Sequence, residues 1–300
     1  MGSLRFSDRA ARTAWRIVPK RALSGVIGWW ASRGIPRRLR AGFLTRFARG
    51  YGIDVSEAEE PLGAYPRVDA FFTRRLRPGA RPIDASPDSV VSPADGTVIE
   101  AGLVTDGQLI QAKGVLFDLD ELLSDGEATA RLQGGAYLIT YLSPRDYHRV
   151  HSPVAGAIIG WHHVPGTLFP VGAKSVGREP GLFVSNERLV TLIDGPAGLC
   201  AVVMVAAVGV GNITACYDPD IATHSRSFRR AGVRHMRYDV PRPVGKGDEI
   251  GTFHMGSTTI AVFEPGRVRL QSFTPGGVTR MGEVIGRASA VSTTAVMETG

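Results

Sequence analysis

The sequence predicts an α+β protein, with N-terminal amphipathic helices on a Gly-rich, mainly antiparallel β body. Between about residues 90 and 287, short apolar runs alternate with Gly, Pro, Asp and Asn, a pattern typical of strands joined by tight turns. The 37 glycines and 19 prolines among the 300 residues fit many such turns. By contrast, residues 4–50 carry apolar side chains at helical spacing, for example Leu23, Ile27 and Trp30.

Charge divides the chain in the same way. Residues 1–50 contain twelve Lys or Arg and one acid, whereas the remaining residues contain 23 bases and 27 acids. We therefore expect a basic helical segment over 1–50, a connector over 51–88 and a β-rich body over 89–300. A segment with this charge attracts anions, which could be nucleic acid, an anionic membrane leaflet or an import receptor.

The basic segment has the composition of helices that lie in a membrane interface. Its apolar stripes include tryptophans and alternate with arginines, so that rings can enter the acyl boundary while guanidinium groups stay on phosphates. The residues expected to touch the membrane are Trp29, Trp30, Arg37, Arg38 and Arg40. The alternatives are a helical cap packed on the body with a solvated basic face, and a cleaved organellar presequence.

Two further features limit the class of protein. An uncharged and wholly apolar run, residues 197–211, has 15 residues, fewer than the roughly 20 needed to span a bilayer, so we expect a buried strand there. Cys200 and Cys216 are too few for a disulfide framework and have no metal-ligand spacing. We therefore expect buried thiols, a reduced compartment and no metal site.

Three polar stretches beside apolar runs carry residues with chemical potential: 91–97, 141–153 and 253–259. They supply the carboxylate of Asp95, the imidazoles of His148 and His151, and the hydroxyl of Ser257, which follows Gly256. These are the components of a relay in which a carboxylate orients an imidazole that takes the proton of a serine. Each stretch alone is more often structural. His162 and His163 are poorly placed to share a metal, because adjacent strand residues point to opposite faces.

In this order, and together with Phe71-Phe72-Thr73-Arg74 and residues 168–171 and 186–188, the stretches resemble bacterial pyruvoyl-dependent phosphatidylserine decarboxylases, which are made as proenzymes. The likeness extends from about residue 19 to about residue 286. One position departs from the family pattern, because Met255 stands where Leu is usual before the Gly-Ser pair. Since Met is close to Leu in volume and polarity, we expect cleavage to survive.

The resemblance implies a mechanism. Asp95 would hold His151 as the base that activates Ser257, and the chain would cut itself between Gly256 and Ser257. The products would be a β chain of residues 1–256 and an α chain of residues 257–300, which remain together as a heterodimer and dimerise further. Ser257 would become a covalent pyruvoyl cofactor, and His148 would return a proton to carbon when phosphatidylserine loses carbon dioxide to give phosphatidylethanolamine. The expected location is peripheral, on the cytoplasmic face of the cell membrane.

Two other classes remain open from the residues themselves. A Ser-His-Asp lipid hydrolase or acyltransferase would use the same triad, but its serine should lie in a Gly-x-Ser-x-Gly turn that enters a helix. A non-enzymatic membrane- or nucleic-acid-binding module would explain only residues 1–50. We expect no nucleic-acid partner.

Overall fold

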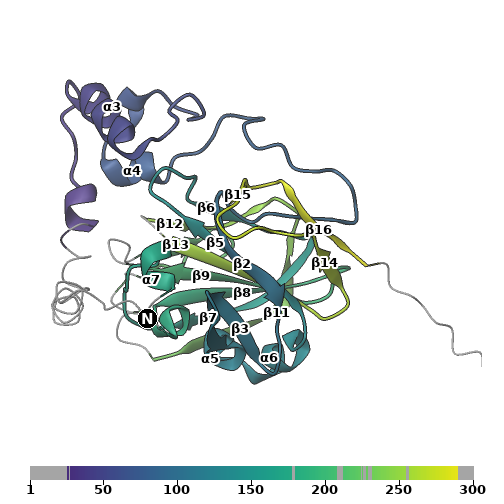
Figure 1. The fold of residues 1–300 in the computed structure, drawn as a ribbon. Coiled ribbons are helices and arrows are strands. Elements are labelled where there is room, and N and C mark those ends of the chain that lie inside the picture. Colours follow the sequence, from purple (N-terminus) through teal and green to yellow (C-terminus); the bar gives the residue numbers. More distant parts are fainter. Residues whose placement is uncertain are drawn as a thin grey trace, which may run out of the picture.

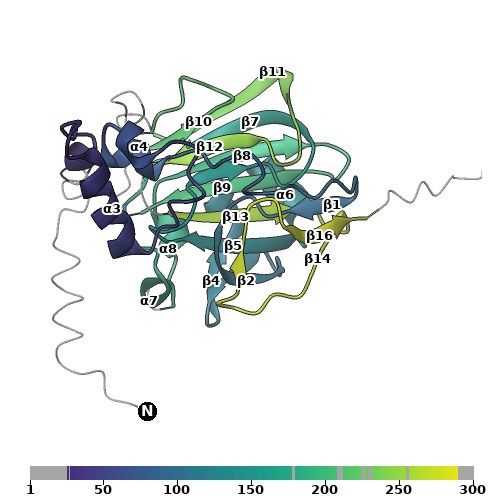
Figure 2. The same cartoon turned by 90° about the horizontal axis from the view of Figure 1, so that it is seen from above.

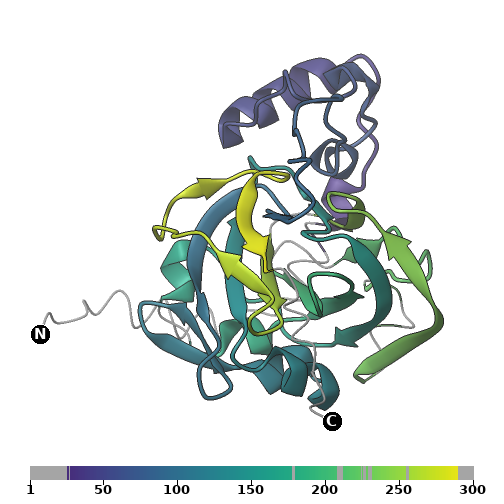
Figure 3. The same cartoon turned by 90° about the vertical axis from the view of Figure 1, so that its right-hand side faces the viewer.

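The computed structural model describes residues 26, 28–177, 180–207, 212–223, 225, 228, 232–254 and 257–289. Most of the predicted first helix, Met255 and Gly256 therefore lie outside the described residues, as does the end of the predicted α chain. The described part forms a helical unit at one end of a β body, as Figures 1, 2 and 3 show from three directions. This arrangement confirms the predicted α+β class.

The helical unit is built from three elements, α3 (Arg40–Tyr51), the 3-10 turn η1 (Leu62–Ala64) and α4 (Val68–Phe72), and it also includes the short helix before them that ends at Ala31. Helix α3 ends at Gly52, whose φ of 70° is the left-handed conformation that glycine adopts without strain. The three elements share a small apolar core that includes Leu44, Tyr65 and Phe71. Because this core is separate from that of the β body, the helical unit holds its shape largely through its own contacts.

The β body is organised around one eight-stranded sheet with the strand order β11-β7-β8-β9-β13-β5-β2-β15. Every strand pair given within it is antiparallel. In the order of the sheet, the strands are β11 (Arg234–Val244), β7 (Gly156–Val164), β8 (Arg188–Asp194), β9 (Cys200–Ala206), β13 (Ser257–Phe263), β5 (Ala136–Leu142), β2 (Gly96–Leu103) and β15 (Val278–Thr279).

The two central strands, β9 and β13, are buried at every position. Such strands lack polar alternation, because both of their faces lie against other parts of the protein. Strand β9 falls inside the uncharged run 197–211, as the sequence predicted, and Cys200 is buried within it. The other thiol, Cys216, is exposed, so the expectation of a buried side chain there is wrong.

Smaller sheets and short helices cover the two faces of the main sheet (Figure 1). One face of the main sheet lies against a three-stranded sheet with the order β10-β12-β6. The two sheets are in close contact, since a Cβ on Gly251 of β12 would lie 2.8 Å from the sulfur of Met204 in β9. The strands of the smaller sheets are β6 (Arg149–His151), β10 (Ile213–Ala215) and β12 (Glu249–Phe253), then β1 (Ser89–Val91), β14 (Val268–Leu270) and β16 (Val284–Ala288), and the hairpin β3 (Gln108–Ala112) with β4 (Val115–Asp118).

The opposite face is covered mainly by α5 (Leu119–Leu123), α6 (Gly126–Leu132) and α8 (Leu182–Ser185), with α7 (Ala173–Val176) near its edge. The side chains of Asp118 and Asp125 each accept two backbone N–H bonds and so cap α5 and α6. Within the described residues, no helix has both the length and the apolar character needed to cross a membrane.

A glycine between α6 and β5 provides a test of the packing of the main sheet. A Cβ on Gly135 would lie 1.7 Å from the carbonyl oxygen of Phe263, so Gly135→Ala must push β13 away. We expect a loss on the order of 1–3 kcal/mol in the free energy of unfolding, seen as a lower Tm by circular dichroism. The control is Gly126→Ala, where a Cβ meets nothing within 4 Å and the helix gains about 1 kcal/mol at most. Equal Tm values for the two variants would contradict this close approach.

Candidate active site

Ser257 opens the central strand β13 and lies between Leu142 of β5 and Ala206 of β9. Its side chain is completely buried, and its hydroxyl has no hydrogen-bond partner among the described residues. A buried hydroxyl without a partner costs free energy and calls for an explanation, of which a role in the chemistry is one. Because Ser257 enters a strand rather than a helix, the geometry expected of a hydrolase nucleophile is not found here.

His151 ends strand β6 in the sheet that overlies Ser257's face of the main sheet. Its Nδ1 lies 2.8 Å from the carbonyl oxygen of Gly247, which can only accept, so Nδ1 carries the proton and Nε2 keeps its lone pair. Tyr147 Oη lies 3.3 Å from Nε2, and burial raises the pKa of this phenol to about 12. Burial also lowers the pKa of His151 below its ordinary value of 6.5. At neutral pH the ring is therefore an uncharged base.

Asp95 follows β1 and is bound on two sides. Arg81 donates to both carboxylate oxygens, with Nε 2.9 Å from Oδ1 and Nη2 2.5 Å from Oδ2, and the backbone N–H of Met281 donates to Oδ1 at 2.9 Å. Arg81 also binds Glu57 through two bonds of 2.8 and 2.9 Å. No hydrogen bond joins Asp95 to His151 in the described part of the chain. Their interaction is electrostatic at longer range, and the Gly247 carbonyl orients the imidazole.

His148 differs from the sequence-based expectation. Its ring is completely buried beneath Phe72, with 3.9 Å between the ring centroids, and its Nδ1 lies 2.8 Å from the carbonyl oxygen of Asp146. Burial, with a further contribution from the charge of Arg74, lowers the pKa of His148 to about 3. The expectation that His148 titrates near neutral pH is therefore wrong for the uncut chain. Nε2 is a bare, buried nitrogen with no partner among the described atoms.

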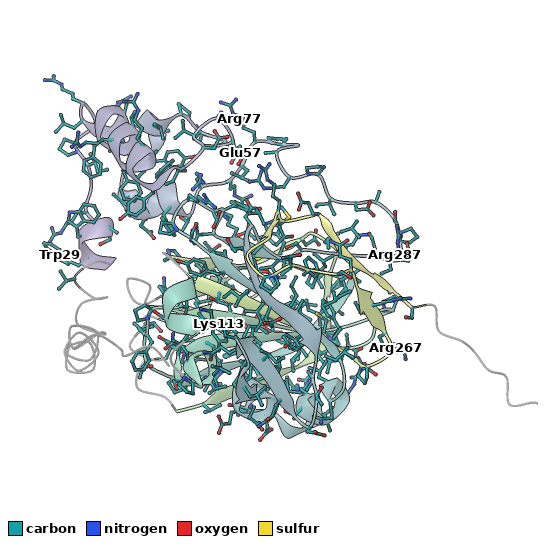
Figure 4. All side chains as sticks on the ribbon, in the orientation of Figure 1. Trp29, Glu57, Arg77, Lys113, Arg267 and Arg287 are labelled. Atoms are coloured by element: carbon teal, nitrogen blue, oxygen red, sulfur yellow. The ribbon has the colours of Figure 1, made fainter. Side chains whose placement is uncertain are left out.

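A polar cavity of about 240 Å³ lies where the helical unit meets the β body, beside Asp95. Glu57, on the loop after α3, projects toward this junction (Figure 4). The cavity is also lined by Arg74, Arg81 and Tyr147. The sequence analysis missed Glu57 and Arg81. The only signal for them is the repeated Arg in residues 74–81, which does not identify the carboxylates that these arginines bind.

The two adjacent histidines of β7 point to opposite faces, as predicted. His163 Nε2 lies 2.9 Å from Glu187 Oε1 on the face that carries Ser257. His162 lies 2.8 Å from Asp125 on the other face and also contacts His235. The two rings therefore have separate carboxylate partners and cannot share one ligand.

The helical unit exposes a set of large apolar side chains beside its arginines. Trp29 is 58% and Trp30 47% exposed, and the guanidinium of Arg33 lies 4.0 Å from the Trp29 ring centre (Figure 4). Arg37 and Arg38 are exposed, whereas Arg40 is partly buried and donates from Nε to the carbonyl of Ile35 at 2.9 Å. The other exposed apolar residues of this unit are Val26, Leu39, Phe43 and Tyr51.

Comparison with known proteins identifies the family to which this chain is similar. The sequence model of the family described as phosphatidylserine decarboxylase matches residues 68–287, which include Asp95, His148, His151 and Ser257. The phosphatidylserine decarboxylase proenzyme of Anaeromyxobacter sp. (strain K) is 46% identical over 285 residues, which cover 95% of this chain and 100% of that protein.

Two further relatives carry the same name. The proenzyme of Myxococcus xanthus is 44% identical over 94% of this chain and 99% of its own length. That of Bordetella avium is 40% identical over 93% of this chain and 95% of its own length. With the match extending over nearly the whole chain, and with the buried serine at the head of its central strand, the chain belongs to the phosphatidylserine decarboxylase family.

Proposed function

We propose that this chain is a proenzyme that cuts itself before Ser257 and then converts phosphatidylserine to phosphatidylethanolamine and carbon dioxide with a pyruvoyl group made from Ser257. The observation that carries the proposal is the Ser257 hydroxyl, which is completely buried and unpartnered among the described residues. The proenzymes named for related chains support the same reading.

In the proposed self-cleavage, His151 acts as the base that activates Ser257. The hydroxyl oxygen attacks the carbonyl carbon of Gly256, His151 Nε2 takes the hydroxyl proton, and the peptide nitrogen leaves with a proton, which converts the amide into an ester. Loss of the Ser257 α-proton then expels the Gly256 carboxylate. The remaining enamine takes up water, releases ammonia and leaves a ketone at position 257. In this scheme Asp95, fixed by Arg81, stabilises the positive charge that forms on His151.

The surroundings of Ser257 fit a pyruvoyl group. The neighbouring side chain on β9 is the small Ala206, and the hydroxyl has no described partner that its loss would leave unsatisfied. When present, the ketone supplies an acceptor for the electron pair that departing carbon dioxide leaves behind. His148 is proposed to return the proton to carbon. Because its pKa is about 3 in the continuous chain, it must first gain water or charge contacts that Phe72 now excludes.

The cut products provide the first test of this proposal. The purified protein should give two bands on a denaturing gel, and mass spectrometry should find a fragment of residues 257–300 whose first residue is pyruvoyl. Ser257→Ala should remain one chain, because no hydroxyl is present to attack. Asp95→Asn should slow the cut, on the order of 100-fold or more, because the charge beside His151 is lost. An uncut wild-type protein that still releases carbon dioxide would refute the proposal.

The pH dependence of the cut tests the role of His151. Burial lowers the pKa of His151 below 6.5, so the ring stays neutral, and able to accept a proton, at pH 6.5. The rate of cleavage of freshly translated chain should therefore fall only below pH 6.5, with a midpoint beneath that value. His151→Gln should stay uncut throughout the pH range. A midpoint at or above pH 6.5 would contradict the assignment of His151 as the buried base.

We propose also that the helical unit docks the enzyme on an anionic membrane surface, on the cytoplasmic face of the cell membrane. Exposed tryptophans beside arginines support this proposal, since aromatic rings favour the interface and guanidinium groups favour lipid phosphates. The two cut chains are proposed to remain together, because β13 is paired on both sides with strands of the longer chain.

Membrane docking can be tested without removing the helices. The double variant Trp29→Ala/Trp30→Ala and the double variant Arg37→Gln/Arg38→Gln should each sediment several-fold less with phosphatidylglycerol vesicles than the wild type. The control, Leu103→Ala/Val240→Ala, removes side chains that are 66% and 81% exposed on the β body and should sediment normally. Equal sedimentation of all four proteins would exclude this surface as the docking site.

A further inference from the structure

Glu187 and Ser257 lie in one row across the main sheet. The carbonyl of Glu187 accepts the N–H of Ala206 at 2.9 Å, and Ala206 is in turn the register partner of Ser257. Residues paired in this way point to the same face of a sheet. Two strand spacings place the Cα atoms of Glu187 and Ser257 about 10 Å apart. Ala206, whose side chain is only a methyl group, is the residue between them in this row, so the side chains of Glu187 and Ser257 point to the same face of the sheet.

Glu187 is held by a neighbour on the same face. His163 of β7 is the register partner of Leu189, and its Nε2 lies 2.9 Å from Glu187 Oε1. The exposed fractions of these residues are 0% for His163 and 8% for Glu187. The His163 ring also packs edge-on against Phe228, with 5.0 Å between the centroids. Glu187 and His163 therefore form a fixed pair that is removed from solvent, and they differ in this from an ion pair on the surface.

Burying such a pair costs free energy that a pair of apolar side chains would not cost. The cost is higher here because His163 Nδ1 has no partner among the described residues. Neither residue is used by the self-cleavage scheme, whose imidazole, that of His151, comes from the overlying strand β6. Glu187 and His163 lie on the same face of the sheet as Ser257 but have no part in cleavage. We therefore expect a role for them in the reaction that follows cleavage.

We propose that Glu187, positioned by His163, binds the ammonium group of the substrate's serine head group and takes one proton from it. This inference rests on the proposed function. The ammonium cannot attack a ketone at position 257 until one N–H bond breaks, the proton bonds to a Glu187 oxygen and the nitrogen regains its electron pair. A buried anion is suited to both steps, because it attracts the cation and becomes neutral on accepting the proton. His163 holds the carboxylate in place through its N–H donor.

The test compares Glu187→Gln with Asp125→Asn. The second variant is the matched control, because Asp125 lies 2.8 Å from His162 on the other face of the same strand. Both should cut into two chains as the wild type does. In calorimetry, the cut Glu187→Gln protein should bind glycerophosphoethanolamine at least 10-fold more weakly than the cut control, because the carboxylate that receives the ammonium is gone.

Decarboxylation provides the second readout. With phosphatidylserine in mixed micelles, Glu187→Gln should lose roughly 100-fold in kcat/KM at neutral pH, the usual value of a general base. That deficit should shrink between about pH 7 and about pH 9, since solvent then removes the amine proton instead. Glu187→Asp should recover part of the rate and of the binding, which a purely structural role would not predict.

Three outcomes would overturn the inference. Glu187→Gln could fail to cut, or it could bind glycerophosphoethanolamine and decarboxylate phosphatidylserine as well as Asp125→Asn does. The third outcome is a loss of kcat/KM that is equal at all pH values while the binding of glycerophosphoethanolamine is unchanged. These outcomes are distinct from failure of the proposed function. In that case the wild type itself would stay uncut or would not release carbon dioxide.

Discussion

The constraint on which the site depends is the burial of β13 between β5 and β9. Seven consecutive residues of this strand are buried, and each side of its backbone is bonded to a neighbouring strand. Such a strand cannot shift by one residue without moving its side chains to the wrong face. Ser257, as its first residue, is therefore held in a fixed direction. The same sheet fixes Glu187 and His163 at defined register positions, so strand pairing sets the direction of these three side chains.

A second constraint joins the helical unit to the β body. Arg81 lies in the connector and binds Glu57 on one side and Asp95 on the other. All three side chains are largely removed from solvent, where charge-assisted and bidentate hydrogen bonds are strongest. The unit that carries the exposed tryptophans is therefore linked through one guanidinium to a carboxylate beside His151. Phe72, at the end of α4, adds a second link because its ring covers His148.

The sequence was informative where local patterns decide the structure. Apolar runs separated by turn residues predicted antiparallel strands, the uncharged run predicted β9, and the helical spacing of apolar residues within 4–50 predicted the helix α3. The short helices α5 and α6 were missed, although Asp118 and Asp125 are cap residues that could have indicated them. Five- and seven-residue helices carry too little periodicity to stand out in a β-rich segment.

Long-range contacts could not be predicted in the same way. The pairing of Arg81 with Asp95 joins residues 14 apart, and that of Glu187 with His163 joins residues 24 apart, through a fold that the sequence does not specify locally. The burial of His148 beneath Phe72 depends on how α4 docks, which also lies beyond a local pattern. The four candidate side chains were chosen from motifs, whereas their charge states and orienting partners follow only from tertiary packing.

The pairing of β13 also bears on how a cut molecule would behave on denaturation. In the proposed products, β13, β15 and β16 belong to the short chain, while their partners β5, β9, β2 and β1 belong to the long one. Unfolding would then separate two polypeptides, and renaturation would become a second-order encounter whose yield depends on dilution. The precursor folds as one molecule, but the mature enzyme would survive heat mainly through a high barrier to strand separation. Cleavage would thus make unfolding less reversible, and the stability of the mature enzyme would be mainly kinetic.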